Sequence, residues 1–387
     1  MVPFLNNLSL KKRLLQRYAN ANQGFGWLGW LLVLLTPFVF LLGLGIGPVA
    51  IDAQQLLYLL PRLLNDALLS PLGLGNAAVH DPALSSLHII IMDIRLPRTL
   101  LAWLVGAGLA ISGAAMQGLF RNPLADPSII GVTSGASLGA SIAVVVIANR
   151  IGVGGAEQWG GLSILVMGAF IGGLLAVLIV YRLSTASSDG VTSNSTSVAT
   201  MLLVGIAITA LAGAGNSLLA YIADNNTMRS MSLWNMGGLD AANVLRVKLA
   251  GSIIIPAIFL LMCFSRQLDA MLLGESEAKH LGVDVQRVKW ALIVIVAIAV
   301  ASSVALAGVI GFVGLVVPHM LRMVIGPSHR RLLPYSALAG GLMLVMADIV
   351  ARVIVSPAEM PVGVITAILG APLFIFLLRQ RRDYGMY

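Results

Sequence analysis

Residues 97–119 read PRTLLAWLVGAGLAISGAAMQGL, and this stretch contains one charged side chain, that of Arg98. About 20 consecutive apolar residues are enough to cross the hydrocarbon core of a bilayer as an α-helix. The stretch therefore predicts a transmembrane helix. Similar apolar stretches lie on both sides of it along the 387 residues, so we expect an all-α, polytopic membrane protein.

The composition of the whole chain agrees with this expectation. Hydrophobic residues make up 58% of it and charged residues 10%, whereas soluble globular proteins carry about 25% charged residues. So few charges cannot cover the surface of a soluble protein, which excludes a soluble enzyme and a disordered chain. The single Cys263 excludes a disulfide within the chain, and the five histidines include no helix-spaced pair that predicts a metal site.

About ten segments are long and apolar enough to be spans. They are roughly 25–47, 97–119, 128–148, 160–182, 198–222, 247–265, 288–307, 311–325, 333–355 and 362–379. Only Gly308 to Ile310 separate the short eighth span from the seventh, so we expect a tight turn or a broken pair of helices there. Gly131, Gly135 and Gly139 form a small-xxx-small pattern, which lets membrane helices approach closely.

The basic residues predict the orientation. Four of them precede the first span: Lys11, Lys12, Arg13 and Arg17. That apolar run exceeds the roughly 7–15 residues of a signal-peptide core, so it is expected to be retained. Eight of the 24 Lys and Arg residues fall on the side opposite the N-terminus: Arg62, Arg95, Arg98, Arg150, Arg229, Arg246, Lys248 and Arg352. Because basic residues favour the cytoplasm, we expect a cytoplasmic segment 1–24, one transmembrane domain over 25–380 and a cytoplasmic tail 381–387.

The most polar loop on the cytoplasmic side covers residues 266–289. Four leucines lie among its charges: Leu268, Leu272, Leu273 and Leu281. The pattern predicts a short amphipathic helical hairpin, broken near Gly274 and Gly282. A solvated loop would not need these leucines, whereas a surface that docks a soluble partner would.

The chain carries no recognisable energy source. The nucleotide-binding string G-x-x-x-x-G-K-[ST] does not occur in it. A buried carboxylate could instead carry protons or sodium, and Asp348 is the strongest candidate within a span. Arg352 follows it at i+4, so a structural ion pair and a proton relay are both open. We therefore expect a passive translocator, not an enzyme, which a partner drives through the 266–289 loop.

Several strings are too specific to arise from composition. In chain order they are RLPR at 95–98, RNPLADP at 121–127, SGA at 134–136, GFVGLVVPH at 311–319, ADIVAR at 347–352 and GAP at 370–372. This ordered set resembles the FecCD family of ABC-importer permeases, which serve iron–siderophore, haem and vitamin B12 uptake. The resemblance covers about residues 90–380.

The resemblance implies a ten-helix permease, of the vitamin B12 permease type, in the bacterial inner membrane. Its implied partners are a second permease copy or a paralogue, two cytoplasmic ATPase subunits, a periplasmic binding protein and membrane lipid, with no nucleic acid. ATP and magnesium would be bound by the ATPases and no cofactor by this chain. The residues that would couple to the ATPases lie in the 266–289 loop: Gly274, Glu275, Glu277, Leu281, Gly282 and Val283.

The resemblance also gives the outside arginines a role. Arg95, Arg98 and Arg352 match family arginines that contact acidic residues of the binding protein, and Arg forms bidentate bonds to carboxylates. The alternatives are snorkelling at helix ends or, for Arg352, pairing with Asp348.

Two further sets of residues match the family's pathway. Asn122, Pro123 and Leu124 match a cytoplasmic gate loop, although an Asn-Pro turn would form there anyway. The fifth span would line the translocation path at a dimer interface through Gly205, Thr209, Gly213 and Asn216. Ordinary small-residue helix packing is the alternative for that span.

The cargo expected from the resemblance is an iron(III)–siderophore complex, with vitamin B12 or haem as the alternative. A secondary transporter powered by an ion gradient is the rival class, and it would work without an ATPase. Two stretches, 61–86 and 184–197, are longer than in typical family members, and the sequence does not assign them a role.

Overall fold

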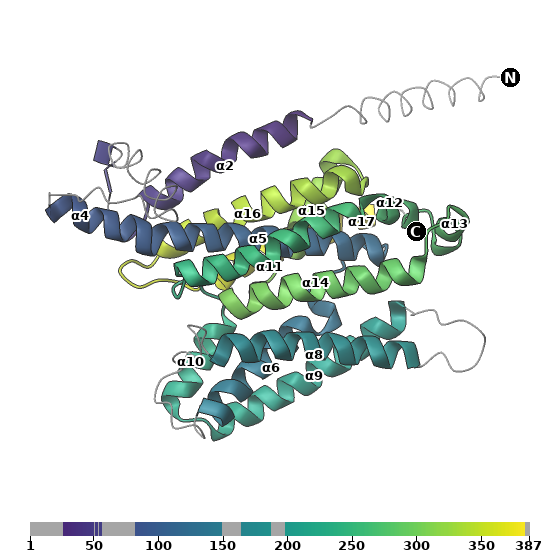
Figure 1. Ribbon diagram of the computed structural model, residues 1–387, viewed down its shortest axis with the longest axis horizontal. Helices are drawn as coiled ribbons and strands as arrows, with labels where there is room; N and C mark the ends of the chain where they lie inside the picture. Colours follow the sequence, from purple (N-terminus) through teal and green to yellow (C-terminus); the bar gives the residue numbers. More distant parts are fainter. Residues whose placement is uncertain are drawn as a thin grey trace.

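The computed structural model describes residues 26–49, 51–52, 54–55, 82–148, 164–186 and 198–383, and all its regular elements there are helices (Figure 1). Among these residues, seven helices are long and apolar enough to cross a membrane, and three shorter apolar helices accompany them: Val132–Val146, Val313–Ile325 and Val362–Phe376. The prediction of an all-α fold with about ten spans is confirmed. The segment 1–24 and most of the 61–86 stretch lie outside the described residues.

The elements follow the predicted order with small shifts in their ends. They are α2 (Trp27–Gly45), α4 (Pro82–Ile89), η2 (Ile90–Arg95), α5 (Leu96–Leu119), η3 (Pro127–Ile130), α6 (Val132–Ile142), η4 (Ala143–Ala148), α8 (Ile164–Ala186), α9 (Val198–Ile222), α10 (Asn225–Asn235), α11 (Val244–Cys263), α12 (Ser265–Met271), α13 (Glu275–His280), α14 (Val285–Ala307), α15 (Val313–Ile325), α16 (His329–Val353) and α17 (Val362–Asp383). The second span is longer than predicted because the π-helical η2 joins α4 to α5.

The helix α5 forms the centre of the bundle. Nearly all its residues are buried, and α11, α14, α15 and α16 pack against it (Figure 1). The helices α6, α8 and α9 form a second group, which α14 joins to the first through α8. We call the end of the bundle that carries α12 and α13 the inner end, and the end that carries α4 and α10 the outer end.

Glycines allow the closest helix crossings. A Cβ added at Gly139 in α6 would overlap the carbonyl oxygen of Gly168 in α8, and one added at Gly106 in α5 would overlap that of Gly340 in α16. Lipid tails are as apolar as leucine, so membrane helices associate through such close packing and not through a hydrophobic drive. The predicted role of the small-xxx-small pattern is therefore confirmed for Gly135 and Gly139, both of which contact α8.

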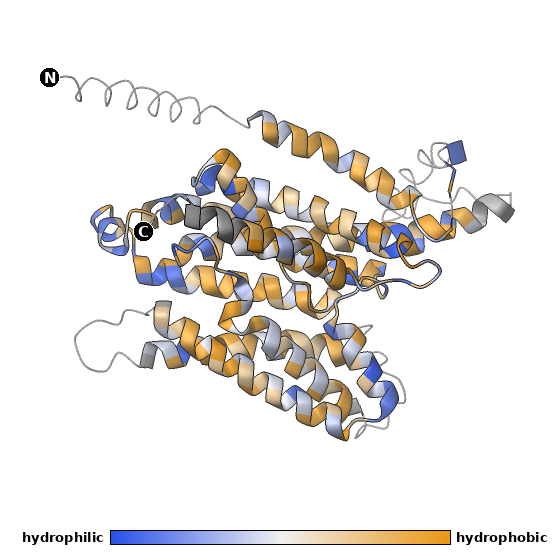
Figure 2. Cartoon of the chain, turned by 180° about the vertical axis from the view of Figure 1, so that it is seen from behind, coloured by the Kyte–Doolittle hydropathy of each residue, from blue (hydrophilic) through white to orange (hydrophobic). Residues whose placement is uncertain are grey.

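The outer surface of the bundle is apolar. Figure 2 shows hydrophobic residues along the middle of the helices and hydrophilic ones mainly at their ends. Leu34 in α2 is 68% exposed and Leu203 in α9 is 69% exposed. Such faces would be unfavourable in water, and they fit a chain whose helices lie in a bilayer.

The seventh and eighth spans meet in a turn over residues 308–312. Gly308 has φ +69° and Phe312 has φ +67°, so the chain reverses through two left-handed residues. α15 is 13 residues long, which at 1.5 Å per residue is about 20 Å, shorter than the hydrocarbon core of about 30 Å. The predicted tight turn and short eighth helix are both confirmed.

Candidate functional site

A cavity of about 670 Å³ opens between the two helix groups. Its lining comes from α5, the turn between α5 and η3, η3, α6, α9, α10, α15 and the 308–312 turn: Leu109, Leu124, Asp126, Pro127, Ser128, Ile129, Thr133, Ser134, Ser137, Thr209, Gly213, Asn216, Asn235, Val309, Ile310, Gly311, Phe312, Gly314 and Leu315. The lining therefore combines apolar side chains with small polar ones and includes one carboxylate, that of Asp126.

The polar side chains on one wall of the cavity bond to one another. The Ser137 hydroxyl donates to Asn235 Oδ1 at 2.6 Å and accepts from Asn216 Nδ2 at 3.0 Å. Ser141 donates to Asn216 Oδ1 at 2.7 Å. Ser134 and Thr209 lie 3.2 Å apart through their hydroxyl oxygens. These bonds join α6 to α9 and α10, and they leave few strong hydrogen-bonding groups to hold a ligand in the cavity.

Three of the four predicted path residues line this cavity. They are Thr209, Gly213 and Asn216. Gly205 does not, because an added Cβ there would overlap the carbonyl oxygen of Ile129 in η3. Sequence reasoning missed Ser137 and Asn235, since single small polar residues in a helix carry no signal of which face they occupy.

The predicted gate residues form the turn between α5 and η3. The Asn122 side chain accepts a hydrogen bond from the backbone N–H of Leu124 at 3.0 Å, which is the local bond that favours Asn in turns. Arg121 before it has φ +49°. Leu124 lines the cavity while Asn122 is exposed, so the turn borders the cavity at the inner end of α5.

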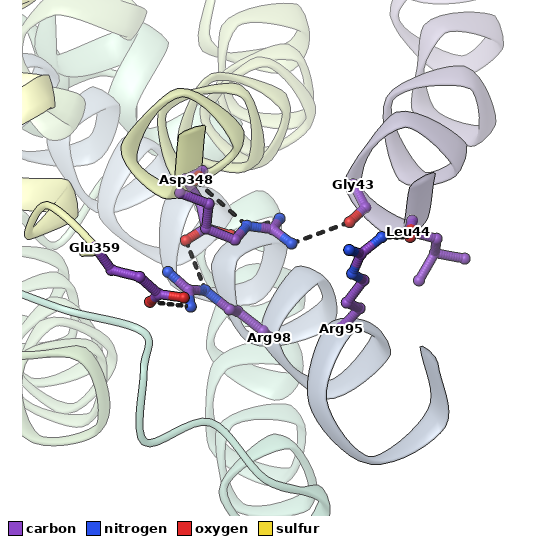
Figure 3. A network of polar contacts seen from close by, with 7 residues as sticks. Gly43, Leu44, Arg95, Arg98, Asp348 and Glu359 are labelled. Carbon is purple, nitrogen blue, oxygen red and sulfur yellow. Dashed lines mark hydrogen bonds and ion pairs between the residues drawn. The ribbon is translucent and has the colours of Figure 1, made fainter. Parts of the chain in front are cut away.

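The three predicted docking arginines are buried at the outer end. Arg95 is 4% exposed, Arg98 is 5% exposed and Arg352 is 2% exposed. The guanidinium groups of Arg95 and Arg98 turn toward other parts of this chain (Figure 3), and that of Arg352 contacts Gly43 and Asp348. In this conformation none of the three presents an open guanidinium to a partner, and their docking role stays a prediction.

Arg95 and Arg352 bind the C-terminal end of α2. Arg95 donates to the carbonyl oxygen of Leu44 at 2.7 Å (Figure 3). It also donates to that of Gly45 at 2.7 Å and to that of Val49. Arg352 donates to the carbonyl oxygen of Gly43 at 3.1 Å. The last carbonyls of a helix have no partner within it and carry partial negative charge. The two arginines therefore cap α2 and hold it on the bundle.

Asp348 lies between two arginines. Its carboxylate is 2.9 Å from Nε of Arg98 and 2.8 Å from Nη2 of Arg352. The predicted Asp348–Arg352 ion pair is thus confirmed. Arg98 also contacts Glu359 at 2.6 Å, and the Glu359 side chain is 36% exposed. Sequence reasoning missed Glu359, which lies in the loop between α16 and α17, and missed Arg98 as a partner of Asp348.

The 266–289 loop contains the predicted helical hairpin, formed by α12 and α13. Gly274 directly precedes α13 with φ +123°, and Gly282 follows the helix with φ +83°. The N–H of Val283 donates to the Ala278 carbonyl and that of Gly282 to the Lys279 carbonyl, each at 3.0 Å. This bond pair is a Schellman motif, which requires the left-handed residue that glycine supplies.

A hydrogen-bonded helix cap and an ion pair hold the hairpin on the spans. Asp269 in α12 accepts from the backbone N–H of His329 at 2.6 Å and from its ring Nδ1 at 2.9 Å, so it caps the N-terminus of α16. Burial would raise the pKa of Asp269, but the hydrogen bonds from His329 outweigh it and lower that pKa below its usual value. Glu275 in α13 lies 2.7 Å from Lys289 in α14.

The tip of the hairpin faces outward. Leu273 is 67% exposed and Leu281 is 63% exposed. Glu277 is exposed as well, while Val283 is half-buried. Two exposed leucines beside charges fit a surface that binds a soluble partner, which is the arrangement that the sequence predicted.

The spanning bundle, the internal cavity and the polar hairpin at one end define a multi-pass membrane permease. The FecCD transport family matches residues 34–380 of the chain. The chain belongs to this family, whose members are permeases of ABC importers.

Two relatives illustrate the family. The hemin transport system permease protein HmuU of Yersinia pestis is 45% identical over 292 residues, which are 76% of this chain and 84% of HmuU. The cobalamin import system permease protein BtuC of Halobacterium salinarum is 43% identical over 294 residues, 76% of this chain and 74% of that protein. Their names therefore point to two different cargoes.

A solved structure shares the fold. It shows an inward-facing conformation of a metal-chelate type ABC transporter, with a TM-score of 0.73 and 32% sequence identity. The match covers 91% of this chain and 98% of that one. The similarity thus extends over almost the whole described bundle.

Proposed function

We propose that this chain is the translocation subunit of an ABC importer that moves a bulky metal chelate, haem in the first place, into the cytoplasm. The observation that carries the proposal is the cavity of about 670 Å³, with its small and mutually bonded polar lining. A conduit must release its cargo, so weak binding groups suit it. The name of the relative from Yersinia pestis favours haem, and that of the relative from Halobacterium salinarum supports cobalamin as the second candidate.

An ATP-driven mechanism fits the site better than an ion-coupled one. A proton or sodium relay needs a carboxylate that can change its charge or its partners. Asp348 lies between two guanidinium groups and is fully buried. Both guanidinium groups already hold its carboxylate in ion pairs, so we infer that it serves as a structural anion.

The motor is proposed to bind the inner end. Two ATPase subunits, which hold ATP and magnesium, would contact the hairpin through Leu273, Leu281 and Glu277. A second permease copy or a paralogue would complete the path beside α9, and the turn at Asn122 to Leu124 would gate it. In this proposal the segment 1–24 and the tail 381–387 lie in the cytoplasm, and the chain lies in a bacterial inner membrane.

The periplasmic binding protein is proposed to dock at the outer end. Arg98 is the arginine that pairs with Glu359, whose side chain is 36% exposed. A carboxylate of the binding protein could take the place of Glu359, because both would bind the same guanidinium. Arg95 and Arg352 would act indirectly, by holding α2 in place.

Uptake into liposomes tests the proposal. The permease would be reconstituted with its ATPase and binding protein, and hemin, cyanocobalamin and a ferric siderophore, each radiolabelled, would be supplied in turn. We expect ATP-dependent accumulation of hemin and none without the ATPase. Accumulation of cyanocobalamin or the siderophore alone would refute haem as the cargo, and the assignment as an ABC importer would remain. Uptake driven by an ion gradient without the ATPase would refute the ABC importer assignment.

A further inference from the structure

The helix α13 of the hairpin is joined to the span α14 by an ion pair. The Lys289 ammonium lies 2.7 Å from the Glu275 carboxylate, and the Lys289 side chain is only 4% exposed. Glu275 opens α13, and Lys289 is the fifth residue of α14. The carboxylate of Glu275 thus points inward, whereas the neighbouring Glu277 is exposed.

This ion pair is buried on its Lys289 side, whereas the Glu275 side chain is 33% exposed. Separating α13 from α14 would take the carboxylate away from an ammonium that is almost fully buried, and reducing the compensation of a buried charge is unfavourable. The pair between Arg287 and Asp284 in the same region is 2.9 Å long, but its side chains are 89% and 52% exposed. Water screens such a surface pair, so it contributes little.

The helix α14 leads from this ion pair to the cavity. It is 23 residues long, which at 1.5 Å per residue is about 35 Å. It packs against α5, α8 and α11 and ends at the 308–312 turn. Val309, Ile310, Gly311 and Phe312 of that turn line the cavity. Because α14 continues directly into this turn, a displacement of the inner end of α14 can move the residues that line the cavity.

We propose that Glu275 is a positioning residue, which with Lys289 fastens α13 to α14 so that a movement of the hairpin reaches the cavity wall. The inference rests on the proposed function, because it assumes an ATPase that moves the hairpin. It separates the roles of two neighbouring acidic residues. Glu275 transmits the movement inside the permease, and the exposed Glu277 remains to contact the motor.

A cysteine reporter in the cavity tests the inference without knowledge of the cargo. Gly311 suits this purpose, because an added Cβ there meets nothing within 4 Å. Gly311→Cys would be introduced with Cys263→Ser, which removes the native cysteine. The complete complex with its ATPase would be labelled with a water-soluble maleimide, first without nucleotide and then with ATP, magnesium and vanadate.

Four variants carry the comparison. Lys289→Met and Glu275→Gln each break the ion pair, the double variant Glu275→Lys with Lys289→Glu restores it with exchanged charges, and Arg287→Met breaks the exposed pair as a matched control. In the parent we expect the labelling rate to differ between the two nucleotide states. The two neutral variants should lose this difference while they still bind the ATPase and hydrolyse ATP. The exchanged pair should regain the difference, and Arg287→Met should retain it.

The possible failures are distinguishable. A parent complex that binds no ATPase, or labels equally in both states, would overturn the proposed function and this inference with it. A responsive parent whose neutral variants respond equally would overturn the positioning role alone. The double variant with exchanged charges gives a further test. If its assembled complex shows no difference in labelling rate, the positioning role is also overturned, because restoring opposite charges would not restore the response.

Discussion

The guanidinium of Arg98 in α5 lies 2.9 Å from the carboxylate of Asp348 in α16, although 250 positions of the chain separate the two residues. The contact fastens the outer ends of α5 and α16, which pack against each other. Arg352 and Glu359 complete the cluster, so two positive charges face two negative ones. The cluster is therefore neutral as a whole, which makes its burial beside the membrane tolerable.

Arg98→Met should destabilise the permease strongly. Removal of one partner from a buried pair costs about 3–5 kcal/mol, because the remaining charge loses compensation. The measurement is the midpoint of thermal unfolding in detergent, with Arg287→Met as the exposed control, for which we expect at most about 1 kcal/mol. Equal midpoints for the two variants would show that the Arg98 cluster does not hold the bundle together.

Glu359→Gln should strengthen docking of the binding protein if Arg98 is the docking residue. The substitution frees the Arg98 guanidinium from a competing carboxylate, whereas Arg98→Glu should abolish the attraction and add repulsion. Affinity of the binding protein for the reconstituted complex would be measured at low and high salt, since screening weakens charge pairs. Weaker binding by Glu359→Gln would instead make Glu359 itself a contact and refute the competition.

Gly282→Val should disturb the hairpin and leave the spans intact. Gly282 has φ +83°, and a side chain in that left-handed conformation costs about 1–2 kcal/mol. We expect faster proteolysis at the hairpin and less cargo transported per ATP hydrolysed. Gly251→Ala in α11 is the matched control, because its Cβ would make only ordinary contacts at 3.7 Å or more. Equal behaviour of both variants would argue against a specific role of the turn.

Gly213→Phe should block transport without preventing assembly. An added Cβ at Gly213 meets nothing within 4 Å, and the residue lines the cavity, so the ring can enter the cavity without displacing a helix. We expect uptake to fall at least about tenfold, equivalent to ~1.4 kcal/mol on the rate-limiting barrier, with normal recovery of the complex. Unimpaired uptake would place the cargo path elsewhere.

Asp269→Asn should reveal a pH-dependent contribution to stability. The pKa of Asp269 is lowered by the hydrogen bonds from His329, although burial opposes this. Its stabilisation is therefore complete above the unfolded pKa of about 3.9 and is lost as the pH falls through the lower folded value. Parent and variant should differ by about 0.5–2 kcal/mol near neutral pH, as for other helix caps, and converge in acid.

Thermal unfolding in detergent at about pH 7, 5 and 3.5 brackets the unfolded pKa of the carboxyl. Asp284→Asn is a control, because that residue caps α14 from an exposed position. If the stability difference between Asp269→Asn and the parent stays constant down to the lowest pH, ionisation of the Asp269 carboxyl is not the source of the stabilisation.

The sequence by itself determined the features that depend on neighbouring residues. The spans follow from apolar runs of sufficient length, and the hairpin breaks follow from Gly274 and Gly282, whose left-handed φ angles other residues rarely adopt. The Asp348–Arg352 pair follows from its i,i+4 spacing on one helix. The ordered motifs indicated the family, which the match over residues 34–380 confirms.

Only the tertiary structure decided which side chains meet across the bundle. Gly205 and Gly213 are the same residue type on the same helix. Gly205 nevertheless packs against η3, whereas Gly213 lines the cavity. Arg98 forms an ion pair with Asp348, and Glu275 forms one with Lys289, each on another helix. In an apolar helix surrounded partly by lipid and partly by protein, both faces have similar hydrophobicity, so the sequence carries little signal of rotation. Packing between helices fixes that rotation, and the partners of each buried charge follow from it.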